Sequence, residues 1–159
     1  MANTATDTDA GTPTDTGTAA QTAPSDLGPM AKTVWPCLVF EDCLGSIDFL
    51  VRAFGFVSTA TYALEDEPTV VEHAELRWPE GGGIMCGSPG RDDSEFSKRP
   101  SGSGSLYVVT DHPDELCERA LAAGAELVRG LRDEDYGSRG FTVKDPEGNL
   151  WSFGTYAGQ

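Results

Sequence analysis

The chain has 159 residues, a hydrophobic content of 38% and a formal net charge of −15. A field of that sign repels nucleic acid and anionic membranes, so we expect neither as a partner. The charge favours a cationic ligand, although acidity also serves simply to keep a protein soluble. No run of 18 apolar residues predicts a membrane span, and no apolar run follows a basic start as in a secretory signal. We therefore expect a cytoplasmic protein.

The first 31 residues differ in composition from the rest of the chain. They are almost wholly Thr, Ala, Asp, Gly and Pro, with no aromatic residue and a single leucine. Such a segment buries too little apolar surface to offset the entropy lost on ordering. We predict a disordered tail over residues 1–31 and one folded domain over residues 32–159.

Four cysteines are scattered along the chain without a CxxC pair: Cys37, Cys43, Cys86 and Cys117. This spacing, with no export signal, is typical of buried reduced thiols in a cytoplasmic protein and does not favour a zinc site.

The folded part begins with a strand over residues 34–42. A helix follows, with apolar residues at helical spacing and a terminating Gly55. Three further strands are predicted in "FVSTATYAL", "VVEHAELRW" and "GGIMCGS".

The same order then recurs. A strand over residues 105–111 precedes a helix in which Asp111 can cap and Pro113 suits the first turn. That helix ends at Gly124, and strands are expected near "AELVRG", "SRGFTVKD" and "LWSFGTY".

The two rounds share an offset of 69 residues. Asp42 corresponds to Asp111 in this alignment, and Gly55 corresponds to Gly124. We interpret this as a βαβββ unit used twice: module one spans residues 33–89 and module two spans residues 105–157. Residues 90–104, rich in polar residues, Gly and Ser, form the linker.

The paired units, "FGF" after the first helix, "HAELRW" and above all "YGSRGFTVKDPEGNLWSFGTY" at residues 136–156 resemble the vicinal oxygen chelate superfamily. That superfamily includes glyoxalase I, bleomycin-resistance proteins and extradiol dioxygenases. The resemblance implies an α+β fold in which two βαβββ modules form a cupped mixed sheet, with helices on the outer face and a ligand cavity on the other. It does not by itself fix a function.

The resemblance also implies positions for four metal ligands, and this chain departs from the pattern at them. Ser152 stands where metal-dependent members carry Glu, and Gly104 and Ser105 stand where the second module should carry His. The offset leads from Gly104 back to Trp35, which is no ligand. The strand "GGIMCGS" offers only Cys86, and only with a shifted register. We therefore predict no metal and no cofactor.

Alternation sorts the strand "VVEHAELRW" into two faces. Ala74, Leu76 and Trp78 should pack on the helices, which leaves His73, Glu75 and Arg77 for the cavity or for a solvated outer surface. His73 has a side chain suited to general-base catalysis near neutral pH, or it hydrogen-bonds a ligand. Glu75 would orient His73 or pair with Arg77.

The same alternation assigns the residues of the other strands to the core or to the ligand cavity. Residues expected in the core are Pro36, Leu38, Phe40, Tyr107, Val109, Trp151 and Phe153. Residues expected at the ligand are Trp35, as a stacking surface, and Cys37, Val39, Leu106, Val108, Ser152 and Tyr156. Phe96 in the linker is a candidate lid, and Tyr136 lies at the mouth of the last hairpin. Arg139 is interpreted as a rim residue or as a structural partner of Asp145.

Three functions remain open from the sequence. The first is a metal-free, homodimeric binding protein of the bleomycin-resistance type that sequesters a cationic or aromatic small molecule. The second is a glyoxalase-like lyase, isomerase or dioxygenase that uses His73 or Glu75. The third is a structural or regulatory domain whose cavity has no ligand.

Overall fold

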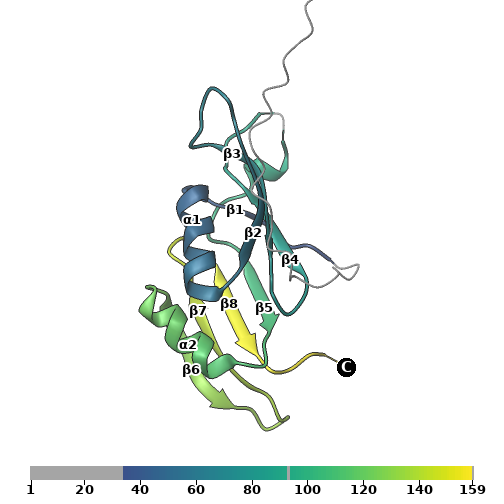
Figure 1. The fold of residues 1–159 in the computed structure, drawn as a ribbon, viewed down its shortest axis with the longest axis vertical. Coiled ribbons are helices and arrows are strands. Elements are labelled where there is room, and N and C mark those ends of the chain that lie inside the picture. The colour runs from purple at the N-terminus through teal and green to yellow at the C-terminus, as the bar shows by residue number, and fades with distance from the viewer. Residues whose placement is uncertain (1–33, 93, 159) are drawn as a thin grey trace, which may run out of the picture.

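The computed structural model describes residues 34–92 and 94–158; the predicted tail over residues 1–31 lies outside this range. The described chain forms two successive βαβββ modules, each with its own four-stranded mixed sheet (Figure 1). The predicted α+β class is therefore confirmed. No helix in the described part of the chain is long and apolar enough to cross a membrane.

Module one contains β1 (Cys37–Val39), α1 (Cys43–Phe49), β2 (Val57–Ala63), β3 (Val71–Arg77) and β4 (Gly83–Gly87). Asp42 caps α1 by accepting a hydrogen bond from the backbone N–H of Gly45. The helix continues into a π-helical turn, η1 (Leu50–Phe54), and ends at Gly55, whose φ of 92° suits glycine. The sheet order is β1-β4-β3-β2, with β1 parallel to β4.

Module two contains β5 (Ser105–Val109), α2 (Pro113–Ala122), β6 (Glu126–Asp133), β7 (Arg139–Lys144) and β8 (Leu150–Gly154). The order β5-β8-β7-β6 repeats that of module one, with β5 parallel to β8. The predicted cap is wrong, because the residue at the N-cap of α2 is His112 and its side chain does not cap the helix. The connection between the modules carries one short 3-10 turn, η2 (Phe96–Lys98).

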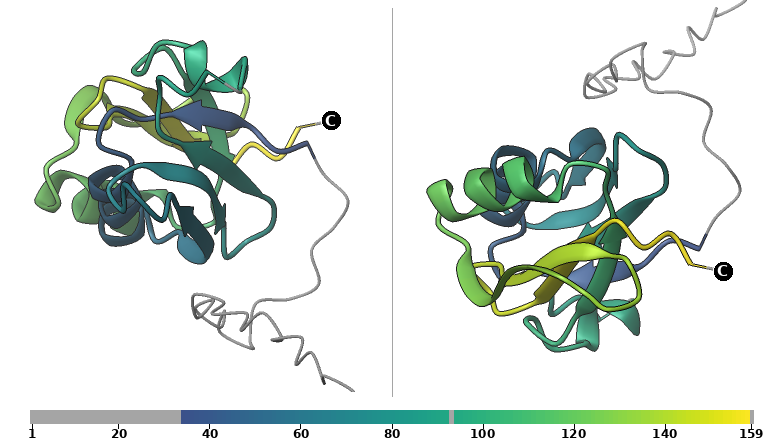
Figure 2. Two further views of the ribbon diagram at one scale, coloured as in Figure 1. Left: turned by 90° about the horizontal axis from the view of Figure 1, so that it is seen from above. Right: turned by 90° about the horizontal axis from the view of Figure 1, so that it is seen from below.

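Both helices lie side by side on one side of the two sheets (Figures 1 and 2). Arg119 of α2 donates hydrogen bonds to the carbonyl groups of Val51 and Arg52 at the end of η1, which joins the helices of the two modules. The carbonyl of Val51 also accepts a hydrogen bond from the N–H of Gly55, and the guanidinium group adds a second donor at the end of η1.

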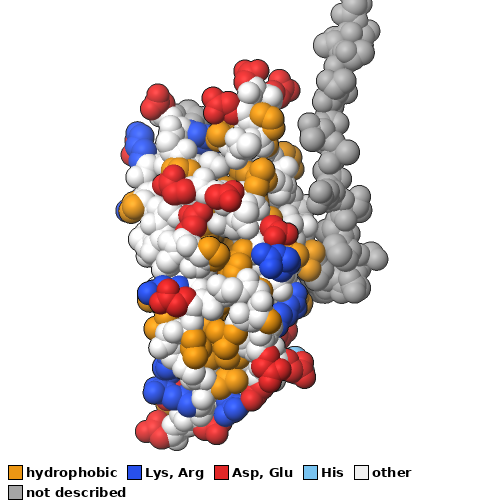
Figure 3. All heavy atoms as spheres, turned by 90° about the vertical axis from the view of Figure 1, so that its left-hand side faces the viewer, with side chains coloured by type: hydrophobic (Ala, Val, Ile, Leu, Met, Phe, Trp, Pro, Cys, Tyr) orange, Lys and Arg blue, Asp and Glu red, His pale blue; other side chains and the backbone are white. Residues whose placement is uncertain are grey.

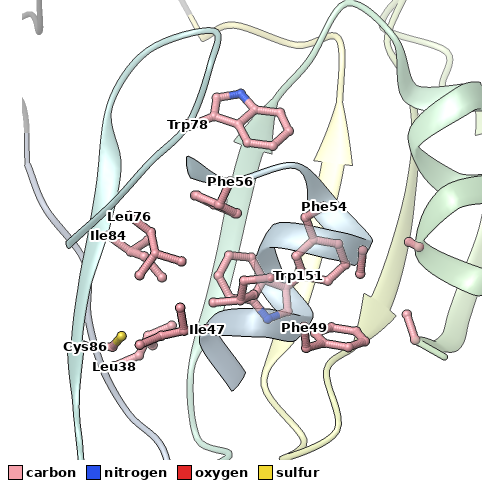
Figure 4. Packing of buried hydrophobic residues seen from close by; sticks show 14 of the residues in the cluster. Leu38, Ile47, Phe49, Phe54, Phe56, Leu76, Trp78, Ile84, Cys86 and Trp151 are labelled. Atoms are coloured by element: carbon pink, nitrogen blue, oxygen red, sulfur yellow. The ribbon is translucent and has the colours of Figure 1, made fainter. Parts of the chain in front are cut away.

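A single aromatic core joins the modules (Figure 4). The ring centroid of Phe54 in module one lies 5.2 Å from that of Trp151 and 4.9 Å from that of Phe153, both in β8. Trp151 and Phe153 have no exposed surface, as predicted for the core. Ala74, Leu76 and Trp78 are also buried, so the predicted alternation of β3 is confirmed.

The predicted alternation of β5 is wrong. Tyr107 and Val109 are 49% and 37% exposed, whereas Leu106 and Val108 pack against the core. The cause is a change of offset between the modules: the N–H of Phe40 binds the carbonyl of Gly87, and the N–H of Thr110 binds that of Gly154. Phe40 thus matches Thr110 at an offset of 70, as the N-cap Asp42 matches the N-cap His112, which is one more than the 69 inferred from Asp42 and Asp111. A shift of one residue exchanges the two faces of a strand.

Two residues near β1 also differ from expectation. Val39 is only 4% exposed, so it is closed off from solvent and does not line an open cavity. Pro36 is exposed instead of packing on a helix, because it lies ahead of the short strand.

Candidate functional site

The face of the first sheet that points away from the helices holds five of the twelve residues that the sequence predicted at the ligand. Trp35, His73, Glu75 and Arg77 are each partly buried there, and Cys37 is exposed. In the strand register Cys37 lies beside Met85, and Met85 lies beside Glu75, so these side chains form one row across three strands. The structure therefore brings together the module-one residues that alternation assigned to the cavity, with the exception of Val39.

The position of the Trp35 ring depends on a glycine at position 83. A Cβ atom added to Gly83 would lie 2.8 Å from Cζ3 of the Trp35 ring, closer than such atoms approach in proteins. Gly83 therefore lets the indole lie against the end of β4, at one end of the polar row. This leaves an aromatic surface beside charged groups outside the core.

His73 forms the polar centre of the same face. Its Nε2 lies 3.1 Å from Oε1 of Glu75, and its ring stacks on Tyr62 of β2 at a centroid distance of 6.2 Å. A carboxylate that contacts imidazole fixes the orientation of the ring. The pair can thus present a fixed imidazole that hydrogen-bonds a ligand.

A hollow of about 240 Å³ opens at the other end of this face, where the connection between the modules crosses it. Its lining residues are Cys37, Glu72, His73, Met85, Cys86, Arg91, Ser94 and Phe96. The predicted lid residue Phe96 does border this hollow. Arg91, Glu72, Met85 and Ser94 were not predicted from the sequence.

A second hollow, of about 440 Å³, lies between the modules. Apolar residues from both modules line it, among them Phe56, Trp78, Ile84, Leu106 and Val108, together with the carboxylates of Glu80 and Asp111. Leu106 and Val108, predicted as ligand contacts, do border this space even though they also pack on the core.

Of the remaining predicted residues, Ser152 lies in β8, Tyr136 lies in the turn between β6 and β7, and Tyr156 follows β8. Tyr136 and Tyr156 meet edge to face at 5.8 Å, and the hydroxyl of Tyr107 accepts a hydrogen bond from the N–H of Tyr156. Ser152 contacts Thr142, with 3.0 Å between their hydroxyl oxygens. These tyrosines are 42–64% exposed, so they form an open aromatic surface separate from the row on the first sheet.

Arg139 is structural, but its predicted partner is wrong. Its Nε and Nη2 each lie 2.7 Å from an oxygen of Asp114 in α2, and Nη1 contacts Asp133. These hydrogen bonds lower the pKa of Asp114 and raise that of Arg139. Asp145 instead accepts hydrogen bonds from Asn149 and from Nε1 of Trp151.

All four cysteines are free thiols, and Cys37 alone of them is exposed. The thiol of Cys43 lies 3.9 Å from that of Cys86, and this contact together with burial raises the pKa of Cys86. Cys86 therefore faces the core as a neutral thiol, on the other side of the strand from Met85.

A divalent metal centre needs three or four converging ligands. Within residues 34–92 and 94–158, no three His, Cys, Asp or Glu side chains are arranged to hold one. The described residues thus do not fit the metal site that the resemblance implies.

Comparison with known proteins now places the chain in a family. Residues 33–153 match the model of the Glyoxalase/Bleomycin resistance protein/Dioxygenase superfamily. The chain belongs to this superfamily. A protein of Mycobacterium bovis is 31% identical over 126 residues, which cover 75% of this chain and 80% of the relative.

The solved structures similar to this superfamily member include TioX and FosX. TioX from Micromonospora sp. ML1 has a TM-score of 0.66 and 29% identity, covering 78% of this chain and 98% of TioX. The fosfomycin resistance protein FosX from Listeria monocytogenes, in complex with Mn(II), has a TM-score of 0.54 over 81% of this chain and 95% of its own. At 15% identity FosX supports the fold alone.

Proposed function

We propose that this protein is a metal-free, cytoplasmic binding protein that sequesters a small aromatic or cationic molecule. The observation that carries the proposal is Trp35, whose ring lies against Gly83 outside the core and beside the row of polar side chains. A binding site needs apolar walls with a few placed polar groups, and this face has both. Membership of a superfamily whose members bind small molecules supports the same conclusion.

The charges favour a cation. The carboxylates of Glu80 and Asp111 border the larger hollow among apolar residues. Figure 3 shows the side of the molecule that carries the helices, where acidic side chains are spread widely with Lys and Arg among them. At the site we expect stacking to dominate the affinity and the net charge of −15 to add a smaller attraction.

We further propose a homodimer in which the two open faces meet. β1 and β5 each end their sheet, so each has an edge to which another strand can bind. The exposed side chains of Tyr107 and Val109 lie beside one of these edges. A second copy would cover this aromatic surface and would bring the residues of the two sheets around one ligand.

The pair of His73 and Glu75 favours a second candidate, an enzyme of the glyoxalase-like branch. The 3.1 Å contact positions Glu75 to hold the imidazole while His73 accepts a proton from a bound substrate. This candidate requires a reaction at the same face, so loss of turnover in His73→Gln with ligand binding intact would support it over sequestration.

Metal content separates the proposal from the metal-dependent members of the superfamily. We expect purified protein to contain well below one equivalent of zinc, nickel, manganese or iron by elemental analysis. Dialysis against a chelator lowers the melting temperature of a metalloprotein, because removal of the metal removes its binding free energy. It should leave the melting temperature of this protein unchanged. A full equivalent of tightly bound metal would contradict sequestration without metal.

The direct test of the proposal is Trp35→Ala. A planar cationic dye such as proflavine should quench tryptophan fluorescence in the wild type. The variant should bind it more weakly by about 1–2 kcal/mol, the scale of a lost aromatic stack and its buried area. Trp35→Phe should retain part of the affinity, and raised salt should weaken binding only modestly. Equal affinity in all three proteins would show that Trp35 does not contact the ligand.

A further inference from the structure

Arg91 is placed unusually for an arginine on a surface connection. It lies between β4 and η2 and lines the hollow of about 240 Å³ on the first sheet. Its side chain is only 14% exposed. Its Nε is buried, and no described residue accepts a hydrogen bond from it. A buried donor without an acceptor is costly, so this atom calls for an explanation.

The backbone around Arg91 is fixed by a buried serine. The hydroxyl of Ser97, which is 1% exposed, accepts a hydrogen bond from the N–H of Arg91 at 3.1 Å. The same hydroxyl lies 2.8 Å from the carbonyl of Arg91 and 2.9 Å from that of Ser94. The N–H of Gly90 binds the carbonyl of Ser97 at 3.0 Å. The connection therefore holds Arg91 over the hollow through several hydrogen bonds.

Glu72 does not satisfy the guanidinium group. Its Oε1 lies 3.5 Å from Nη1, which is longer than the 2.7–2.9 Å typical of a charge-assisted hydrogen bond. Glu72 is also 52% exposed, so water competes for it. This contact uses Nη1 and does not use Nε. The edge of a guanidinium group that carries Nε matches the two oxygens of a carboxylate.

We propose that Arg91 binds a carboxylate of the ligand, so that the ligand class is an aromatic carboxylic acid. The inference rests on the proposed function and adds the acidic group to it. Cys37 lines the hollow with Arg91, and Trp35 lies two residues before Cys37, roughly 7 Å along an extended chain. A ligand that covers this separation therefore extends from the Trp35 ring into the hollow that Arg91 lines. If the ligand also carries the cationic group considered in the proposed function, it is a zwitterion.

The test compares three probes that share one ring: 2-naphthylacetate, its neutral amide 2-naphthylacetamide, and the cation 2-(2-naphthyl)ethylammonium. Their affinities are measured by isothermal titration calorimetry at one ionic strength. The wild type should bind the carboxylate about tenfold more tightly than the amide, against the net charge of the protein. Arg91→Gln should remove this preference and leave the affinity for the amide unchanged.

Arg91→Lys keeps the charge but lacks the planar edge, so it should retain only part of the preference. Arg99→Gln, an exposed arginine in the same connection, is the matched control and should behave as the wild type. Thermal melts check that each variant is folded. If the wild type binds the acid and the amide equally, or if Arg91→Gln keeps the preference, the proposal that Arg91 binds a carboxylate is wrong and the proposed function is unaffected. Failure of all three probes to bind overturns both.

Discussion

Replacing Trp151 with alanine is expected to lower the free energy of unfolding by about 3–5 kcal/mol, the usual cost of removing a large buried aromatic side chain. Trp151 has no exposed surface and packs on Phe54 and Phe56 of module one, at 5.2 and 5.7 Å between ring centroids. Its Nε1 also donates a hydrogen bond to the buried carboxylate of Asp145 at 3.0 Å. The substitution therefore leaves a cavity between the modules and removes one hydrogen-bond donor from the carboxylate of Asp145.

Urea denaturation followed by far-UV circular dichroism measures this loss without relying on tryptophan fluorescence. Trp35→Ala is the matched control, because it removes the same side chain from a position outside the core, and it should cost little stability. If Trp35→Ala unfolds the protein while Trp151→Ala leaves it intact, the two faces of the sheets are assigned the wrong way round. The ligand-binding residues proposed on the first sheet would then be core residues.

Regular alternation made the fold readable from the sequence. From His73 to Arg77 in β3 polar and apolar residues alternate, and the register of a strand buried on one face is set by that pattern. The helix ends were equally clear, because Gly55 and Gly124 have φ values of 92° and 101° that favour glycine. These features depend on local sequence, so a single chain is enough to recognise them.

The errors came from features that depend on distant residues. β5 was inverted because the offset of 69 was taken from Asp42 and Asp111, whereas the strands and the observed N-caps correspond at an offset of 70. The additional residue of module one lies in its helix, which contains the π-helical turn η1. Arg139 pairs with Asp114 across 25 positions, and no periodic pattern predicts such a pair. Arg91 was missed because its position depends on how Ser97 closes the connection.

One overlooked pattern was present in the sequence. The tripeptide Pro-Glu-Gly occurs at residues 79–81 and again at residues 146–148, in the turn before the last strand of each module. Glu147 accepts hydrogen bonds at 2.8 Å from the N–H groups of Glu41 and Asp42, just before α1. Glu80 accepts them from the N–H of Asp111 at 2.9 Å and from the hydroxyl of Thr110 at 2.8 Å, just before α2. Each module thus binds the start of the other module's helix.

Glu147→Ala should therefore destabilise the protein by about 2–3 kcal/mol, since it leaves two backbone N–H groups without their charged acceptor. Glu147 also accepts hydrogen bonds from the hydroxyls of Ser46 and Ser101, and the value expected for Glu147→Ala includes their loss. Glu80→Ala, with one backbone donor and one hydroxyl, should cost about 1–2 kcal/mol. Urea denaturation at neutral pH measures both values.

Glu126→Ala provides the control, because it removes a carboxylate whose ion pair with Lys144 is 70% exposed on the glutamate side. Exposed pairs of this kind contribute about 0–1 kcal/mol, so this variant should remain close to the wild type. The double variant Glu80→Ala/Glu147→Ala should also broaden the unfolding transition, since it removes a contact at each junction while the aromatic core remains. A loss in Glu147→Ala no larger than that in Glu126→Ala would show that the shared core alone joins the two modules.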